Sequence, residues 1–349
     1  MDFSSDNASG VHPAILEALA RANTGTAGAY GNDVWTQRLQ EALSEAFGRR
    51  VFAFPVATGT AANSLALAAL LKPWGAAFVH REAHVAVDEC GAPEFFSGGK
   101  LIEIGKDGAR LSAATFDNAA WSFMNRGVHS VQPMALSFTQ ASETGQVYSA
   151  AEVRALCDTA RAHRLMVHMD GARLANAAAH LRVPLGQFTC EAGVDLVSFG
   201  ATKNGAMGAE ALVAFDETRS EEIQFRRKQA GHLLSKMRFV SAQICAFLEG
   251  GLWLTLAGHA NAMATALRDA LAARAEAEIA YPVEANMVFV RLRTDLAGDL
   301  LKRGARFYPW SPLPENGRQL YRFVCSFQTT ERDIAQFMDA FDKAALALR

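Results

Sequence analysis

Hydrophobic side chains recur at helical spacing near the start of the chain. Leu39, Leu43 and Phe47 are separated by polar residues in the segment 36–47. Apolar positions three and four residues apart lie on one face of a helix. Gly48 follows directly and is typical of a helix C-terminus. This pattern predicts an amphipathic helix over 36–47.

A strand, a turn of small residues and a second helix are predicted next. The apolar run 51–55 is short and contains aromatic and β-branched residues, as strands do. The turn 58–60 leads directly into an apolar helical segment that ends before Pro73. The first N–H groups of a helix lack partners and the helix dipole is positive there, so this turn is a natural site for an anion.

The alternation of helices and strands continues for another hundred residues. The segment 153–164 reads as a helix, and 165–170 and 195–202 read as strands. Strands that alternate with helices indicate parallel βαβ units, in which ligands bind beyond the carboxyl ends of the strands. Two such ends carry chemically useful side chains, because Asp170 closes one strand and Lys203 follows the other.

The pattern changes past residue 250. It predicts an Ala-rich helix, a strand, a short helix, a Pro-rich loop, another strand and a terminal helix; the main segments are 261–278, 287–292, 308–317 and 321–327. A smaller α+β domain fits this order. We therefore predict an α/β protein with a large domain over 1–250, built on a mostly parallel mixed sheet, and a small C-terminal domain over 251–349.

Composition and charge exclude several classes of protein. Half of the 349 residues are hydrophobic, and 34 basic against 36 acidic side chains leave a net charge of −2. This rules out a disordered chain and a strongly basic nucleic-acid binder. The five cysteines are scattered without metal-like spacing, and neither a signal peptide nor a membrane span is evident. We expect a cytoplasmic protein with no bound metal.

The basic residues are mostly arginine, and only eight are lysine, so each lysine can be weighed as a nucleophile. A Schiff-base lysine must be held in place and shielded, which lowers its pKa. Seven lysines lie in turns, at helix ends or on amphipathic helices. Only Lys203 leaves an apolar strand and enters a Gly-rich turn. From that context alone, a structural role for Lys203 is as well supported as a chemical one.

Two other features favour a chemical role for Lys203. Asp170 ends an apolar strand, where a buried carboxylate needs a cationic partner. A protonated pyridine nitrogen would be such a partner, and the phosphate of the same cofactor would suit the turn 58–60. The lysine, the acid and the anion-binding turn thus converge on pyridoxal 5'-phosphate.

Motifs along nearly the whole chain carry a family resemblance. The sequence resembles the low-specificity L-threonine aldolase family of fold-type-I, aspartate-aminotransferase-like pyridoxal-phosphate enzymes, in residues 5–7, 29–33, 60–67, 83–96, 168–173, 199–205 and 228–239. The resemblance implies a fold-type-I large domain, an N-terminal arm over 1–12 near the active site, and a homodimer that pairs into a homotetramer.

The resemblance also implies cofactor-binding residues. Lys203 matches the lysine that forms the Schiff base, and Asp170 matches the acid that keeps the pyridine nitrogen protonated. Arg173 matches an arginine near the ring hydroxyl and the substrate carboxylate. The residues matching phosphate ligands are Gly59, Thr60, Ala61 and, from a neighbouring subunit, Arg238.

For the substrate, the resemblance assigns Arg322 to the amino-acid carboxylate, which an arginine fork binds better than lysine does. Ser5 and Tyr30 match residues close to the substrate. Without the resemblance, Arg322 and Arg238 would be read as ordinary solvated arginines.

The resemblance places His84 on the ring face of the cofactor, near enough to the substrate hydroxyl to be a base. His80 and His84 superficially look like a zinc motif, but the intervening acid is in the middle position, which argues against a metal. Another branch of the family has a histidine where this chain has Glu143. The base could thus be His84, Glu143 or a water. His163 and His180 are expected to be exposed on helices.

The expected activity is reversible cleavage of L-threonine, L-allo-threonine and related β-hydroxy-α-amino acids such as phenylserine to glycine and an aldehyde. An amino-acid racemase, β-eliminating lyase or aminotransferase would share Lys203 and Asp170 but break a different bond. In a non-enzymatic cofactor-binding module, Lys203 would be dispensable. The expected partners are a small-molecule substrate and copies of this chain, with no nucleic acid or membrane.

Overall fold

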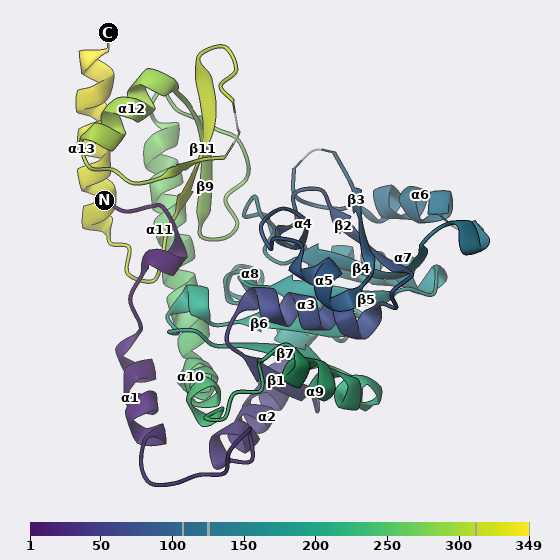
Figure 1. Cartoon of the computed structure of the whole chain (residues 1–349). Coiled ribbons are helices and arrows are strands. Elements are labelled where there is room, and N and C mark those ends of the chain that lie inside the picture. The colour runs from purple at the N-terminus through teal and green to yellow at the C-terminus, as the bar shows by residue number, and fades with distance from the viewer. Residues whose placement is uncertain (107, 124–125, 311–312, 349) are drawn as a thin grey trace.

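A seven-stranded mixed sheet forms the centre of the large lobe. The computed structural model describes residues 1–106, 108–123, 126–310 and 313–348 (Figure 1). The sheet has the order β1-β7-β6-β5-β4-β2-β3, and β7 runs antiparallel to both of its neighbours. The strands are β1 Phe52–Val56, β2 Gly75–His80, β3 Lys100–Ile104, β4 Gln132–Thr139, β5 Met166–Gly171, β6 Leu196–Gly200 and β7 Glu210–Ala214. The predicted mostly parallel mixed sheet is confirmed.

Helices cover both faces of this sheet. One face packs against α3 Gly59–Leu70 and α9 Ser220–Gln229, with α5 Ala92–Ser97 lying beside α3. The opposite face packs against α2 Val34–Phe47, α6 Ala113–Phe123, α7 Ala150–Ala162, α8 Leu174–Leu181 and α10 Arg238–Leu248. Two further helices are α1 Pro13–Ala22, which packs on α10, and the short α4 His84–Val87.

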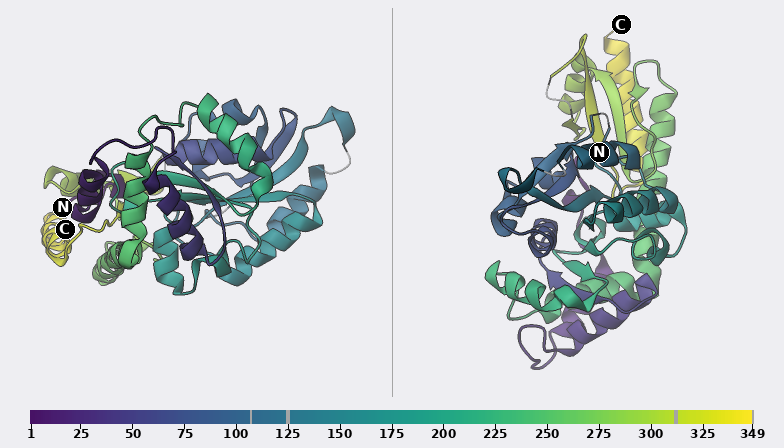
Figure 2. Two further views of the ribbon diagram at one scale, coloured as in Figure 1. Left: turned by 90° about the horizontal axis from the view of Figure 1, so that it is seen from below. Right: turned by 90° about the vertical axis from the view of Figure 1, so that its right-hand side faces the viewer.

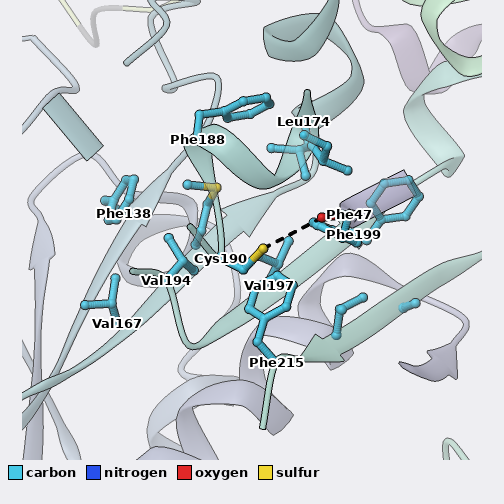
Figure 3. Close-up of a cluster of buried hydrophobic side chains, with 14 of the residues drawn as sticks. Phe47, Phe138, Val167, Leu174, Phe188, Cys190, Val194, Val197, Phe199 and Phe215 are labelled. Atoms are coloured by element: carbon cyan, nitrogen blue, oxygen red, sulfur yellow. Dashed lines mark hydrogen bonds between the residues drawn. The ribbon is translucent and has the colours of Figure 1, made fainter. Parts of the chain in front are cut away.

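Several phenylalanine side chains lie among the aliphatic residues of the core on the second face (Figure 3). Phe47 of α2 makes edge contacts with Phe199 and Phe215, with ring centroids 6.2 and 5.1 Å apart. Val197 and Phe199 point into this core, whereas Leu196 packs under α3 on the other face. Successive side chains of a strand point to opposite faces, so β6 is held from both sides. The segment after β6, which carries Lys203, therefore starts from a rigid support.

The C-terminal part forms a smaller lobe with its own sheet and core. Figure 2 shows this lobe, coloured green to yellow, standing at one end of the large lobe. Its antiparallel sheet has the order β10-β11-β9-β8, with strands β8 Glu278–Ile279, β9 Met287–Arg293, β10 Tyr308–Pro309 and β11 Arg318–Val324. Helices α12 Thr294–Lys302 and α13 Glu331–Ala347 pack on it. The expected small α+β domain is therefore present.

The N-terminus joins the small lobe rather than the large one. Phe3 is fully buried in the C-terminal core, where its ring contacts Phe337 at 5.5 Å. Its N–H donates to the carbonyl of Arg306, and its own carbonyl accepts from Val324. The first residues are thereby fixed beside β11, and the chain then runs past the carboxyl edge of the large sheet.

One long helix belongs to both cores. In α11 Leu252–Ala272, Trp253 packs in the large core, and Leu267 and Leu271 pack in the small one. The segment Arg238–Ala272 is apolar and long enough to cross a membrane, but half of its 18-residue apolar window is buried in the fold and the segment kinks at Gly250. The predicted domain boundary at residue 250 stays a prediction, since the helix that follows it serves both lobes.

The expectation that His163 is exposed is wrong. This residue follows α7, and its side chain is buried. Its Nε2 lies 2.6 Å from Asp117 Oδ1 of α6, and its ring meets the edge of Trp121. Helical spacing within α7 cannot show that α6 packs over its end. Part of the predicted Pro-rich loop 308–317, namely residues 311 and 312, lies outside the described residues, and its start forms β10.

Candidate active site

A cavity of about 250 Å³ opens at the carboxyl edge of the large sheet. Parallel strands end together at one edge, and this places the segments after β4, β5 and β6 around one space. The small lobe closes the cavity from above with Trp310 and Arg322. Eight of the predicted site residues line it: Gly59, Thr60, His84, Glu143, Asp170, Arg173, Lys203 and Arg322.

Lys203 sits in the short 3-10 turn Thr202–Asn204 directly after β6. Burial lowers the pKa of its ammonium group, and the charge of Arg173 adds to this effect. No hydrogen bond or ion pair joins its Nζ to another described side chain. A shielded amine with a lowered pKa is the form that can attack a carbonyl carbon.

Asp170 ends β5 and is almost completely buried. Its Oδ1 accepts from the Ala172 N–H at 2.9 Å, and its Oδ2 accepts from Asn63 Nδ2 at 2.9 Å. Within the described chain, no arginine, lysine or histidine forms an ion pair with it. A buried carboxylate without a cation is costly, so the site fits a ligand that brings a positive charge to Asp170.

The N-terminus of α3 offers free amide groups to the same cavity. Thr58 caps the helix, with its Oγ1 accepting from the Ala61 N–H at 3.1 Å. The N–H groups of Gly59 and Thr60 have no such partner in the described residues, and space around Gly59 is open. These two amides fit a phosphate. The Ala61 N–H already donates to Thr58, so it is not free as the other two amides are. The role of Ala61 as a phosphate ligand stays a prediction.

Two arginines face the cavity from different lobes. Arg173 follows β5, and its Nε and Nη2 donate to the two oxygens of Asp6 at 2.7 and 2.9 Å. Arg322 lies on β11 over the ring of Trp310, at 5.3 Å from its centroid, and its buried Nε has no partner in the described residues. Burial and the charge of Arg173 lower the pKa of Arg322. Two neighbouring cations fit the carboxylate of an amino acid.

His84 and Glu143 are hydrogen-bonded neighbours. The His84 backbone N–H donates to Glu143 Oε1 at 3.0 Å, and Thr139 Oγ1 donates to the same oxygen at 2.6 Å. Burial raises the pKa of Glu143 to about 7, even though these hydrogen bonds act in the opposite direction. The sequence suggested a weaker base than histidine at this position. The structure gives its carboxyl group the proton affinity of a histidine.

A pH dependence of stability follows from this raised pKa. Protonated Glu143 stabilises the fold below its ordinary pKa of 4.5, and that stabilisation is lost as the pH rises through about 7. We expect the melting temperature of the wild-type protein to fall more between pH 5 and pH 8 than that of Glu143→Gln. Thermal unfolding at both pH values measures the difference, with Glu17→Gln on the exposed face of α1 as control. Parallel changes in all three proteins would contradict the assignment.

Besides Ala61, three predicted residues are not among those that line the cavity in this chain. Ser5 caps the short 3-10 helix Asp6–Ala8 and accepts from the Asn7 N–H. Tyr30 is 49% exposed, and the Lys228 ammonium lies 4.8 Å from its ring centroid. Arg238 begins α10 and donates to the Gly25 carbonyl. Their roles at the site stay predictions, and those of Tyr30 and Arg238 would require a second subunit.

Four site residues were missed by the sequence analysis: Asp6, Asn63, Glu89 and Trp310. Asn63 and Glu89 are buried polar residues in the segments that follow β1 and β2. Asp6 belongs to the predicted N-terminal arm, and its carboxylate is almost fully buried against Arg173. The signal that could have identified Asp6 was the presence of an acidic residue in an N-terminal arm predicted to lie near the active site.

Removing the Asp6 carboxylate should destabilise the protein. Burial would raise the pKa of Asp6, but the charges of Arg173 and Lys203 and hydrogen bonds from Arg173 and Asn286 outweigh it and leave this pKa below the ordinary value of 3.8. Breaking a buried ion pair leaves an uncompensated charge. We expect Asp6→Ala to lower the free energy of unfolding by about 3–5 kcal/mol at pH 7.

Urea unfolding measures this loss, and Asp339→Ala is the control. Asp339 pairs with Lys343 on the exposed side of α13, so its loss should cost about 1 kcal/mol or less. Because Asp6 has a lowered pKa, its contribution is present above pH 3.8 and is lost as the pH falls through its folded pKa. Equal effects of the two substitutions at pH 7 would show that the Asp6 pair is not a buried one.

The site supplies what one particular cofactor requires. Within the described residues, a shielded lysine without a hydrogen-bond partner, a buried acid without a cation and helix N-terminal amides without acceptors match three parts of pyridoxal 5'-phosphate. These parts are the aldehyde, the ring nitrogen and the phosphate. With this α/β fold and its small C-terminal lobe, the lysine, the acid and the amides define a fold-type-I pyridoxal-phosphate enzyme. The chain belongs to the beta-eliminating lyase family, whose model matches residues 2–295, and within it to the low-specificity L-threonine aldolase family.

Known proteins support this assignment over nearly the full length. The chain is 39% identical to a low specificity L-threonine aldolase of Pseudomonas sp. (strain NCIMB 10558) over 96% of this chain and 95% of that protein. It is 40% identical to that of Pseudomonas aeruginosa over 94% of this chain and 93% of the relative. The solved structure of Leishmania major threonine aldolase superimposes with a TM-score of 0.92 at 27% identity, covering 98% of both chains.

Proposed function

We propose that this protein is a carbon–carbon lyase that uses pyridoxal 5'-phosphate to cleave L-threonine to glycine and acetaldehyde. L-allo-Threonine and phenylserine belong to the same proposed substrate class, and the reaction is proposed to be reversible. One observation carries the proposal: Lys203, which has no partner among the described side chains, shares a cavity with two arginines and with the hydrogen-bonded pair of His84 and Glu143. The near-full-length similarity to low specificity L-threonine aldolases supports it.

Each residue has a defined task in this reaction. When bound, pyridoxal phosphate withdraws electrons from the substrate Cα through its protonated ring. Asp170 holds the proton of the ring nitrogen, and Lys203 supplies the amine that anchors the cofactor. Arg322 and Arg173 fix the substrate carboxylate and so orient the bond between Cα and Cβ.

The bond breaks when the β-hydroxyl loses its proton, because the oxygen then forms the carbonyl of the aldehyde. His84, Glu143 or a water held between them accepts that proton. Glu143 has a pKa of about 7 and can exchange a proton near neutral pH, which makes it as suitable as the histidine. Reprotonation of Cα completes glycine.

An assay with three substrates tests the activity. Purified protein with pyridoxal phosphate is incubated with L-threonine, L-allo-threonine or L-phenylserine, and glycine and aldehyde are measured together. Equal amounts of both products are expected. Failure to form glycine from any of the three excludes the aldolase, and formation of a keto acid or the D-amino acid instead identifies an aminotransferase, a β-eliminating lyase or a racemase.

A homodimer at least, and a homotetramer built from two dimers, is proposed as the working form. Arg238 and Tyr30 lie outside the cavity of their own chain, as residues that serve a neighbour would. The large apolar side chains of Phe95 on α5 and Phe225 on α9 are exposed beside α3. Light scattering tests the assembly, and a monomer mass of 37.6 kDa would overturn it. The expected cytoplasmic location stays a prediction.

A further inference from the structure

A buried chain of hydrogen bonds connects His84 to Asp170. Glu89 Oε1 lies 2.8 Å from His84 Nδ1 and also accepts from Asn63 Nδ2 at 2.8 Å. The same Asn63 nitrogen donates to Asp170 Oδ2 at 2.9 Å. The four residues come from three separate elements: the segment around α4, helix α3 and strand β5. The amide of Asn63 thus links two carboxylates: that of Glu89 beside the candidate base His84, and that of Asp170, which is assigned to the ring nitrogen of the cofactor.

The two middle members of this chain are shielded from water. The side chain of Glu89 is 0% exposed, and Asn63 is 2% exposed. Glu89 Oε2 and Asn63 Oδ1 are buried and have no partner in the described part of the chain. No lysine or arginine there forms an ion pair with Glu89, so the imidazole of His84 is the group that balances its charge.

We propose that Glu89 and Asn63 are positioning residues that couple the protonation of His84 to that of Asp170. This inference rests on the proposed function. With Glu89 ionised, His84 donates its Nδ1 proton to Glu89, so Nε2 carries the lone pair and is the atom that accepts a proton. Asn63 donates one hydrogen to each carboxylate, which links the two and fixes their separation.

The charged groups around His84 set the sign of each expected effect. The hydrogen bond that His84 donates to Glu89 raises the pKa of His84 most, while burial lowers it. The other groups that face the imidazole or its backbone are Asp170, Lys203, Asp88 and Glu143. Removing the charge of Glu89 should lower the pKa of His84. Removing the amide of Asn63 should raise it, because Glu89 loses a donor and its charge is then balanced by His84 alone.

Two variants and one control test the coupling in the cofactor-loaded enzyme. They are Glu89→Gln, Asn63→Leu and Ser64→Ala. Ser64 follows Asn63 on α3 and is equally buried, but its Oγ has no hydrogen bond in the described residues. Readouts are the pH profile of kcat/KM, kcat and KM separately, and the visible absorbance of the bound cofactor as a function of pH.

The coupling predicts opposite shifts. In Glu89→Gln the acidic limb of the kcat/KM profile moves to lower pH by about one unit, and kcat falls roughly 10–100-fold with KM changed less than about threefold. In Asn63→Leu the limb moves to higher pH, and the pH dependence of cofactor absorbance shifts as well, because Asp170 loses a donor. Ser64→Ala changes neither readout.

A purely structural role gives a different result. If Glu89→Gln leaves the acidic limb in place, or if both variants move it in the same direction, the coupling is wrong. If Asn63→Leu does not fold, Glu89→Gln still decides, because the coupling requires both its acidic limb and its cofactor absorbance to shift. Should the wild-type enzyme release no glycine, the proposed function fails on its own. The coupling is then decided by the pH dependence of cofactor absorbance, which must shift in both Asn63→Leu and Glu89→Gln and stay unchanged in Ser64→Ala.

Discussion

Replacing Lys203 with alanine should abolish the covalent attachment of pyridoxal phosphate and lower kcat for glycine release by roughly 10³-fold or more. The reason is the placement of this amine. It lies at the end of a rigid strand, with a pKa lowered by burial and by Arg173, and no described side chain competes for it. The other seven lysines of the chain do not line the cavity.

Borohydride reduction followed by mass measurement detects the attachment directly. The wild-type chain should gain the mass of one reduced cofactor, and Lys203→Ala should gain none. Lys343→Ala is the matched control, because this lysine pairs with Asp339 on the exposed side of α13. A cofactor that remains attached to Lys203→Ala would place the reactive lysine elsewhere and remove the basis of the proposed function.

Replacing Arg322 with alanine should lower kcat/KM for L-threonine by about 30- to 3000-fold, mostly through KM. Loss of one partner from a buried charged pair costs about 2–5 kcal/mol, and each 1.4 kcal/mol is a factor of ten. Arg322→Lys should recover little of this, since lysine keeps the charge but loses the planar fork and the stacking on Trp310.

Arg318→Ala provides the control on the same strand. Arg318 lies four residues before Arg322 on β11, its side chain is 37% exposed, and it faces Glu278 outside the cavity. Its removal should leave KM unchanged. The absorbance of bound cofactor should be normal in all three variants, which separates a lost substrate contact from a damaged site. A KM for Arg322→Ala within threefold of wild type would show that another group holds the carboxylate.

The main outline of this fold was predictable because its signals are local. Asp170 lies at the end of one apolar strand and Lys203 follows another, and parallel strands end at one edge, so their proximity follows from the pattern alone. The amides of Gly59 and Thr60 were predictable for the same reason, as a strand, a turn and a helix follow one another directly.

The polar pairs behind the cavity could not be found in this way. Asn63 meets Asp170 across 107 positions, and Asp6 meets Arg173 across 167. Neither pair has a periodicity that connects its members, and Asn63 looks like any polar residue within an Ala-rich helix. The pKa of Glu143 was missed because it depends on burial by segments that are distant in sequence. Tertiary packing, rather than local propensity, decides all three.

The long helix α11 bears on how the two lobes can move. Asn204, next to Lys203, donates to the Trp253 carbonyl at its start, and Asn176 and Asn261 exchange hydrogen bonds that tie it to α8. The helix is therefore hydrogen-bonded both to the turn that carries Lys203 and to α8, and its C-terminal half packs in the core of the small lobe. These hydrogen bonds hold Arg322 of the small lobe in its binding position before the amino acid arrives. Little conformational entropy is then lost when the substrate carboxylate binds. Substrates should be selected by their fit to a preformed pocket rather than by closure of a hinge.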